Sequence, residues 1–298
     1  MRREGAGRGA SGLEWDAESK RRLARARAFE TVTLLAALFG VLALAMILGD
    51  VLLDGARHLS GQFFTSYPSR FPERAGIRAP LAGTLWILGL TALMAIPVSV
   101  GAAIYLEEYA PGNWVTRIIR TNIATLAGVP SIVYGILGLA LFVRALGLGQ
   151  SVISGAFTLS LLIIPIIILA SQEAIRAVPR GIREAAYALG ATRWQVVRHQ
   201  VLPLALPGIV SGAILAVSRA VGETAPLIMI GAMSFIAFTP GNLGDPFTAL
   251  PIQIFHWVAR PQEEFKGLAA AAILVLLALV LTMNVAAHMI RSRSRLEE

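Results

Sequence analysis

Two charged side chains lie four residues apart inside a long apolar segment of this 298-residue chain. Arg219 and Glu223 are the only charged residues between positions 204 and 235. A charge at the centre of a membrane helix costs at least ~2.5–3.5 kcal/mol, so it normally faces a partner or a wet cavity. The spacing of four predicts an ion pair on one helical face. Because a guanidinium offers planar, multidentate donors, Arg219 could bind a tetrahedral oxyanion in transit. Glu223 would then orient the arginine and keep its affinity for the anion low enough for release.

The alternative to anion binding is a purely structural role, in which the two charges neutralise each other and fix the packing of the helices. The two interpretations are compatible. Just beyond the pair, Pro226 cannot donate to the carbonyl of Gly222, which allows a kink there. Neutral hydrogen bonds to the anion could come from a further set of side chains, namely Ser131, Tyr134 and Thr224. A hydroxyl in a membrane helix is more often bonded to its own i−4 carbonyl, however, and the tyrosine could simply fill core space. Three glycines are expected to permit close helix approach rather than to touch ligand: Gly128, Gly135 and Gly138.

The composition places these residues in lipid. Hydrophobic residues make up 56% of the chain, charged residues only 15%, and the mean hydropathy is +0.68, whereas soluble domains carry about 25% charged residues. The chain has no cysteine, which excludes disulfides and thiolate chemistry. No phosphate-loop pattern occurs, and the four histidines are scattered along the chain. We therefore expect no catalytic residue, no metal site and no bound cofactor here, with any ATP and Mg²⁺ held by a partner.

Six apolar runs predict an all-α integral membrane protein with six transmembrane helices, because a bilayer core needs roughly 20 helical residues. Five runs fit one crossing each, and the 32-residue sixth needs tilt, a kink or an interfacial end to absorb its excess length. The runs are 31–49, 81–106, 121–143, 151–172, 204–235 and 267–287.

Charge at the ends of these runs predicts the orientation. With both termini in the cytoplasm, the inner segments carry 18 Lys and Arg residues and the outer segments carry 7, as the positive-inside rule requires. This bias also explains the net charge of +8 better than nucleic-acid binding does. The expected organisation is a basic cytoplasmic tail, disordered or lying on the anionic leaflet, a first span with an outer loop, a transmembrane core with a cytoplasmic loop at 173–206, and a C-terminal tail. Their bounds are 1–28, 29–80, 81–290 and 291–298.

The segment 184–203 is the one long polar, helix-patterned stretch between two apolar runs. Ile182, Ala185, Ala186 and Leu189 share one face of a predicted short helix, and Gly190 supplies the positive φ that ends it. A capping box of Thr192 and Gln195 predicts a second helix. Its apolar stripe is Trp194, Val197 and Val201, and Leu202 and Pro203 are expected to end it. On pattern alone, such a helix pair is more often an inert interfacial hairpin than a docking device.

The same segment resembles the EAA loop of ABC-importer permeases. The matching residues are Glu184, Ala185, Ala186, Gly190, Leu202 and Pro203, and Gln200 stands where that family usually has Ile or Val. The resemblance implies a type I permease fold and a loop that couples the chain to a cytoplasmic ATPase subunit, through Glu184, Ala185, Ala186 and Gly190.

Three further stretches resemble PstA-type permeases of high-affinity phosphate ABC importers: SRAVGETAPL at 218–227, GVPSIVYGILGLALF at 128–142 and ALPIQIFHWVARPQEEF at 249–265. This resemblance implies inward transport of inorganic phosphate across the plasma membrane. It also implies a homologous (PstC-like) permease, a (PstB-like) ATPase dimer and an extracellular (PstS-like) phosphate-binding protein. The alternatives are an ABC permease for another solute, such as sulfate, molybdate or an organic compound, or a membrane scaffold or intramembrane enzyme.

Overall fold

The computed structural model describes residues 8–233 and 235–294, and every regular element in these ranges is a helix. The chain divides into two compact units, 1–53 and 54–298, which are described separately. Five helices of the described residues are long and apolar enough to cross a membrane, or six if one bent helix pair counts as a span. The fold is the all-helical one expected from the sequence.

The first unit lies in α1 (Arg8–His58), which contains the predicted first span. The helix begins well before that span. Of the two alternatives for the N-terminal tail, disorder or a place on the anionic leaflet, disorder is therefore wrong for residues 8–28. Residues 1–7, and likewise 295–298 of the expected C-terminal tail, lie outside the described residues.

Four candidate spans of the second unit are largely continuous. These are α3 (Arg78–Ile104), which continues into the π-helix η2 (Tyr105–Tyr109), α6 (Val152–Arg176), α9 (Leu202–Val221) with the turns that precede it, and α12 (Glu263–Ser294). Three short helices outside these spans also belong to the unit: α2 (Gly61–Thr65), η1 (Pro72–Arg74) and α11 (Leu250–Val258).

The run at 121–143 does not form one straight helix. It is divided between α4 (Trp114–Leu126) and α5 (Ser131–Gly138), which continues into η3 (Leu139–Ala145), with a bend of 102° between the two parts. Pro130 stands at the N-cap of α5, and the residue before a proline is disfavoured in helical conformation. The chain therefore turns at 127–130, and six spans result only if the bent pair crosses as one.

The run at 204–235 is also broken. α9 ends at Val221, Gly222 caps it, and the five-residue α10 (Ala225–Met229) follows, with Pro226 in its first turn. A break at 222–224, next to the expected proline, thus takes up part of the excess length of the run.

The core of the second unit is built around α6, the most buried of the long helices. Its neighbours approach closely through small residues. Thr91 and Ser99 of α3 donate hydrogen bonds to carbonyls of Ala156 and Ile164 on α6, at 3.3 and 3.2 Å. On the α9 side, a Cβ added at Gly212 would lie 2.6 Å from the Cβ of Ala170. Small and hydroxyl-bearing side chains of this kind hold helices together where no hydrophobic difference from lipid exists.

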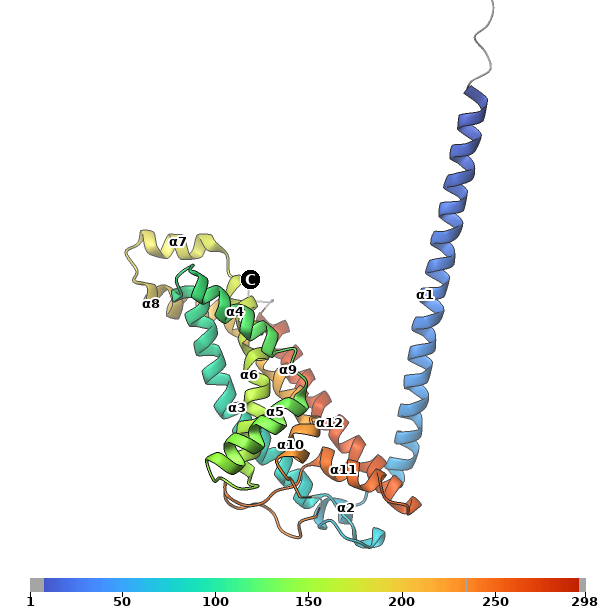
Figure 1. The fold of residues 1–298 in the computed structure, drawn as a ribbon, viewed down its shortest axis with the longest axis vertical. Helices are drawn as coiled ribbons and strands as arrows, with labels where there is room; N and C mark the ends of the chain where they lie inside the picture. The colour runs from blue at the N-terminus through green and yellow to red at the C-terminus, as the bar shows by residue number, and fades with distance from the viewer. Residues whose placement is uncertain (1–7, 234, 295–298) are drawn as a thin grey trace, which may run out of the picture. The chain divides into compact units, whose positions relative to one another are not determined.

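The two ends of the second unit carry different elements. Figure 1 shows α7 (Arg180–Ala188) and α8 (Arg193–Val196) at the end where α12 finishes, and α2 and α11 at the opposite end. The polar segment and the long loops thus lie at opposite ends, as expected for a cytoplasmic loop and outer loops.

Candidate functional site

Arg219 and Glu223 lie at the break between α9 and α10. Arg219 is in the last turn of α9, where the helix dipole favours a cation. Glu223 follows the capping Gly222, so the expectation that both residues share one continuous helix is wrong. The helix stops because the backbone turns at the glycine and Pro226 begins the next helix. The two side chains nevertheless approach each other.

The ion pair between them is loose. Arg219 Nε lies 3.7 Å from Glu223 Oε1, and the side chains are 57% and 17% exposed. A charge-assisted hydrogen bond would be about 2.7–2.9 Å long. The guanidinium therefore keeps open N–H donors on its exposed side, and the pair can orient Arg219 without saturating it.

Of the neutral candidates, only Thr224 lies at this break. It is the N-cap residue of α10, and its hydroxyl is 3.4 Å from the carbonyl of Gly222. Ser131 is the first residue of α5 and half-buried. α5 packs on α10, since a Cβ at Gly135 would lie 2.7 Å from Cα of Pro226. Gly135 thus permits the close approach expected of it.

Tyr134 has a structural contact instead. Its hydroxyl donates a 2.8 Å hydrogen bond to the carbonyl of Leu126, and the residue is only 6% exposed. This bond joins α5 to the end of α4 across the 102° bend, so Tyr134 stabilises the bend. Gly138 is also a packing position, because a Cβ there would overlap the side chain of Thr158.

The predicted helix, glycine turn and helix are present at 180–196. Gly190 has φ +82°, with nothing within 4 Å of an added Cβ. Thr192 and Gln195 form the capping box. The predicted apolar face of α7 is divided: Ile182 and Ala186 pack on a buried cluster, whereas Leu189 is 90% exposed.

Two expectations for the second helix of this loop are wrong. Val197 and Val201 are buried, but Trp194 of the predicted stripe is 56% exposed. Pro203 does not end the helix, because the chain continues through the π-helix η4 (Val197–Val201) into α9. In this wider turn the N–H of Leu202 donates to the carbonyl of Val197, and Pro203, in the first turn of α9, needs no donor.

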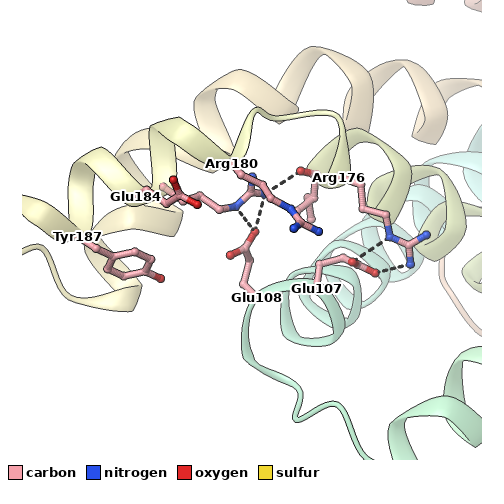
Figure 2. Close-up of a pocket in the computed structure, with 8 residues that line it drawn as sticks. Glu107, Glu108, Arg176, Arg180, Glu184 and Tyr187 are labelled. Atoms are coloured by element: carbon pink, nitrogen blue, oxygen red, sulfur yellow. Dashed lines mark hydrogen bonds and ion pairs between the residues drawn. The ribbon is translucent and has the colours of Figure 1, made fainter.

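An ion-pair network that the sequence analysis missed attaches α7 to the spans (Figure 2). Arg183 donates to Glu108 Oε1 from Nε (3.1 Å) and Nη2 (2.8 Å). It also donates to the carbonyls of Val178 (2.7 Å) and Ile175 (2.9 Å) near the end of α6. One side chain of α7 therefore contacts both η2 and α6, and the carboxylate that it binds is only 9% exposed.

Glu107 makes the second half of this network. Arg176 donates to both of its carboxylate oxygens, at 2.9 and 2.8 Å, and Figure 2 shows the two side chains facing each other. Arg120 of α4 donates to the same carboxylate at 2.8 Å and to the carbonyl of Leu106. Adjacent acids at the end of an apolar run, in a chain whose polar loop is rich in arginine, are the signal that would have pointed to this network.

The network borders an open cavity of about 500 Å³. Arg180, Glu184 and Tyr187 of α7 line it beside the paired residues (Figure 2). Within the described part of the chain, neither Arg180 nor Glu184 has an ion pair. Glu184, the glutamate of the E-A-A sequence, thus lines a cavity in which it and Arg180 have no ion-pair partner among the described residues.

Comparison with solved structures confirms the fold. The chain superposes on a chain of the inward-facing MetNI methionine ABC transporter with a TM-score of 0.60, at 20% identity, over 73% of this chain and 97% of that one. A chain of a bacterial alginate ABC transporter gives a TM-score of 0.64 at 16% identity, over 94% and 98% of the two chains. The architecture is that of type I ABC importer permeases.

Curated relatives are closer in sequence. The probable ABC transporter permease protein YqgI of Bacillus subtilis is 36% identical over 80% of this chain and 85% of its own length. The phosphate transport system permease protein PstA 1 of Mycobacterium tuberculosis is 38% identical over 78% and 76% of the two chains. PstA of Haemophilus influenzae is 33% identical over 83% and 87%. Since the profile of the family also matches residues 95–296, this chain belongs to the binding-protein-dependent transport system inner membrane components, the permease subunits of ABC transporters.

Proposed function

We propose that this chain is the permease subunit through which an ABC importer brings inorganic phosphate into the cell. The observation that carries the proposal is Arg219, whose guanidinium stands at a helix break with its acidic partner held 3.7 Å away. Relatives named phosphate transport permeases support phosphate as the substrate. A bidentate donor fits a tetrahedral oxyanion, and a nearby carboxylate that competes for the donor keeps binding weak enough for release.

In this proposal Arg219 binds the anion, Glu223 orients the arginine, and Thr224 adds a neutral donor at the same break. Ser131 and Tyr134 take second place, because the tyrosine hydroxyl is already bonded to the carbonyl of Leu126. The exposed side of Arg219 is then the side that a homologous, PstC-like permease would complete.

The polar loop would couple transport to ATP hydrolysis in a PstB-like subunit dimer that binds ATP and Mg²⁺. Its tip exposes three large apolar side chains, Tyr187, Leu189 and Trp194. Large apolar groups at a loop tip are what a cleft in a partner would bury. With that loop in the cytoplasm, both termini lie on the cytoplasmic side of the plasma membrane. A PstS-like binding protein then delivers phosphate from the outer side.

Phosphate uptake by cells that depend on this transporter tests the role of Arg219. We expect Arg219→Gln to abolish uptake and Arg219→Lys to retain part of it, because lysine keeps the charge without the planar fork. Arg144→Gln is the matched control, since Arg144 is an exposed arginine at the end of η3 and should leave uptake unchanged. Undiminished phosphate uptake by Arg219→Gln would exclude Arg219 from the pathway, and uptake of sulfate or molybdate instead of phosphate would exclude phosphate as the substrate.

Co-purification tests the coupling role. Leu189→Glu and Trp194→Glu should release the ATPase subunits from the membrane complex, because each places a charge in the proposed contact. Gln200→Glu, an exposed polar position in η4, should retain them. If the ATPase subunits stay bound in both tip variants, or never co-purify with the unmodified chain, the hairpin is not their docking element.

A further inference from the structure

Two arginines line one cavity, and one of them follows α11, which lies at the end of the second unit opposite α7 and α8 (Figure 1). Arg70 precedes η1, and Arg260 follows α11, 190 positions later in the sequence. Both line one open cavity of about 450 Å³, whose other lining residues are Pro68, Ser69, Phe71 and Phe235. Two cations from distant segments therefore line one concave site, and Arg219 is not among its lining residues.

Each guanidinium is stacked on an aromatic ring. The Cζ of Arg70 lies 4.9 Å from the ring centroid of Phe71, and that of Arg260 lies 4.3 Å from the centroid of Phe265. Phe265 is fully buried, so it fixes the plane of its arginine. Stacking of this kind engages the face of the guanidinium and leaves the in-plane N–H donors free.

No acidic residue neutralises these two cations within the described ranges 8–233 and 235–294. Glu263, three residues from Arg260, is paired with Lys266 at 2.7 Å. The effect of the open charge reaches α11, where burial and then the positive charge of Arg260 lower the pKa of His256. An unpaired positive charge thus acts on its neighbours at this end of the molecule.

The backbone on both sides of the cavity is fixed by short-range hydrogen bonds. The N–H of Phe71 donates to the hydroxyl of Ser69 at 3.1 Å, and the N–H of Arg260 donates to the carbonyl of Trp257 at 3.2 Å. Trp257 is completely buried. Since both loops are anchored, the two guanidinium groups need little reorganisation to receive a ligand.

We propose that this cavity is an entry site for a tetrahedral oxyanion of the inorganic phosphate class, upstream of Arg219. The assignment rests on the proposed phosphate transport. Each guanidinium fork, with its open in-plane donors, can bind one edge of a phosphate. Because the cavity is open to solvent, binding is weak and reversible, as an entry site on a conduction path requires.

Arginine modification measures occupancy directly. The complete transporter in lipid nanodiscs is treated with phenylglyoxal, in inorganic phosphate or in chloride of equal ionic strength, and adducts are quantified by mass spectrometry. We expect phosphate to protect Arg70 and Arg260 together, with half-protection at one common concentration. Arg74, an exposed arginine of η1 that does not line the cavity, should react equally in both salts.

Three outcomes would overturn the entry site. Equal reactivity of Arg70 and Arg260 in both salts means that no phosphate binds. Equal protection of Arg74 means general screening. Protection that appears only when the phosphate-binding protein is added means that the cavity receives an acidic side chain of that protein.

Uptake kinetics separate this proposal from the proposed function. Arg70→Gln and Arg260→Gln should each raise the KM for phosphate roughly three- to tenfold, the loss of one ordinary hydrogen-bonded contact in a cavity open to solvent, and leave the maximal rate unchanged. Arg74→Gln should change neither. An unchanged KM in both variants overturns the entry site alone. Phosphate uptake that is undiminished in cells lacking the whole chain overturns the proposed function.

Discussion

Replacing Arg183 by glutamine should loosen α7 from the membrane core. The arginine makes two hydrogen bonds to Glu108 and one each to the carbonyls of Val178 and Ile175, all between 2.7 and 3.1 Å. Its side chain is 17% exposed, and that of Glu108 is 9% exposed. Removing one partner of a fully buried pair costs about 3–5 kcal/mol. Because water can reach this site in part, we expect about 2 kcal/mol.

A loss of about 2 kcal/mol corresponds to a factor of ~30 in the population of the open state, since ~1.4 kcal/mol is a factor of ten. Amide hydrogen exchange of the transporter in nanodiscs reports this opening locally. Peptides that cover α7 should exchange ~30-fold faster in Arg183→Gln. Peptides from the centre of α6 should be unchanged, because they lie in the buried core.

Arg180→Gln is the matched control on the same helix. Arg180 is exposed and has no ion pair among the residues that the structure describes, so its loss should change exchange by no more than ~2-fold, as for an ordinary surface substitution. Glu108→Gln should lie between the two, because Arg183 keeps its bonds to the carbonyls. Equal exchange in Arg183→Gln and Arg180→Gln would refute the view that this side chain fastens α7.

Other positions give sharp expectations of their own. Gly190→Val should destabilise the coupling turn by about 1–2 kcal/mol through backbone strain alone, because φ is +82° and the surrounding space is open; co-purification of the ATPase should fall, and Gly190→Asn should restore most of it. Gly138→Val should lower the melting temperature of the purified chain strongly, since even a Cβ overlaps Thr158. Gly89→Ala, at an exposed helical position of α3 with nothing within 4 Å of the added Cβ, should not lower it. His256 has a pKa below its ordinary value, owing to burial and then to Arg260. The folded state therefore resists protonation, and its contribution to stability is complete above about pH 6.5 and is lost as the pH falls through the lowered pKa. Melting temperatures between pH 7.5 and 5 should fall less in His256→Gln, and an equal fall would show that other groups govern the acid limb.

The apolar runs predicted the spans because lipid imposes a simple length rule on each of them. A proline inside a run makes the path of the helix harder to predict. The run at 121–143, which contains Pro130, is expected to cross once, and the structure bends by 102° between its two helices. The opposite error occurs at Pro203, which was expected to end a helix. The helix continues through it, because the π-helix η4 widens the turn that precedes it. Whether a proline ends, bends or enters a helix depends on the packing of its neighbours, which a single sequence does not show.

In the candidate site, too, the local features could be predicted from the sequence and the long-range contacts could not. Gly190 and the capping box of Thr192 and Gln195 follow from local backbone requirements and are confirmed. The contact between Arg183 and Glu108 joins residues 75 positions apart, and no local pattern pairs them. The exposure of Trp194 was not predicted either. An apolar residue at a helical spacing fits the pattern equally well whether it faces the core of the protein or a partner protein.

These contacts form a continuous series of packed helices between the loop proposed to contact the ATPase and the end of α9 that carries Arg219. Arg183 fastens α7 to η2, which continues into α3. α3 is bonded through Ser99 to α6, and α6 packs without intervening side chains against Gly212 of α9. The regular backbone then stops two residues after Arg219. A displacement of α7 would therefore reach the last turn of α9 through packed helices, and the first place able to yield is the break that separates Arg219 from Glu223. A loose 3.7 Å pair at that point is suited to open and close with the helix, because small changes in its length alter how many guanidinium donors remain for an anion.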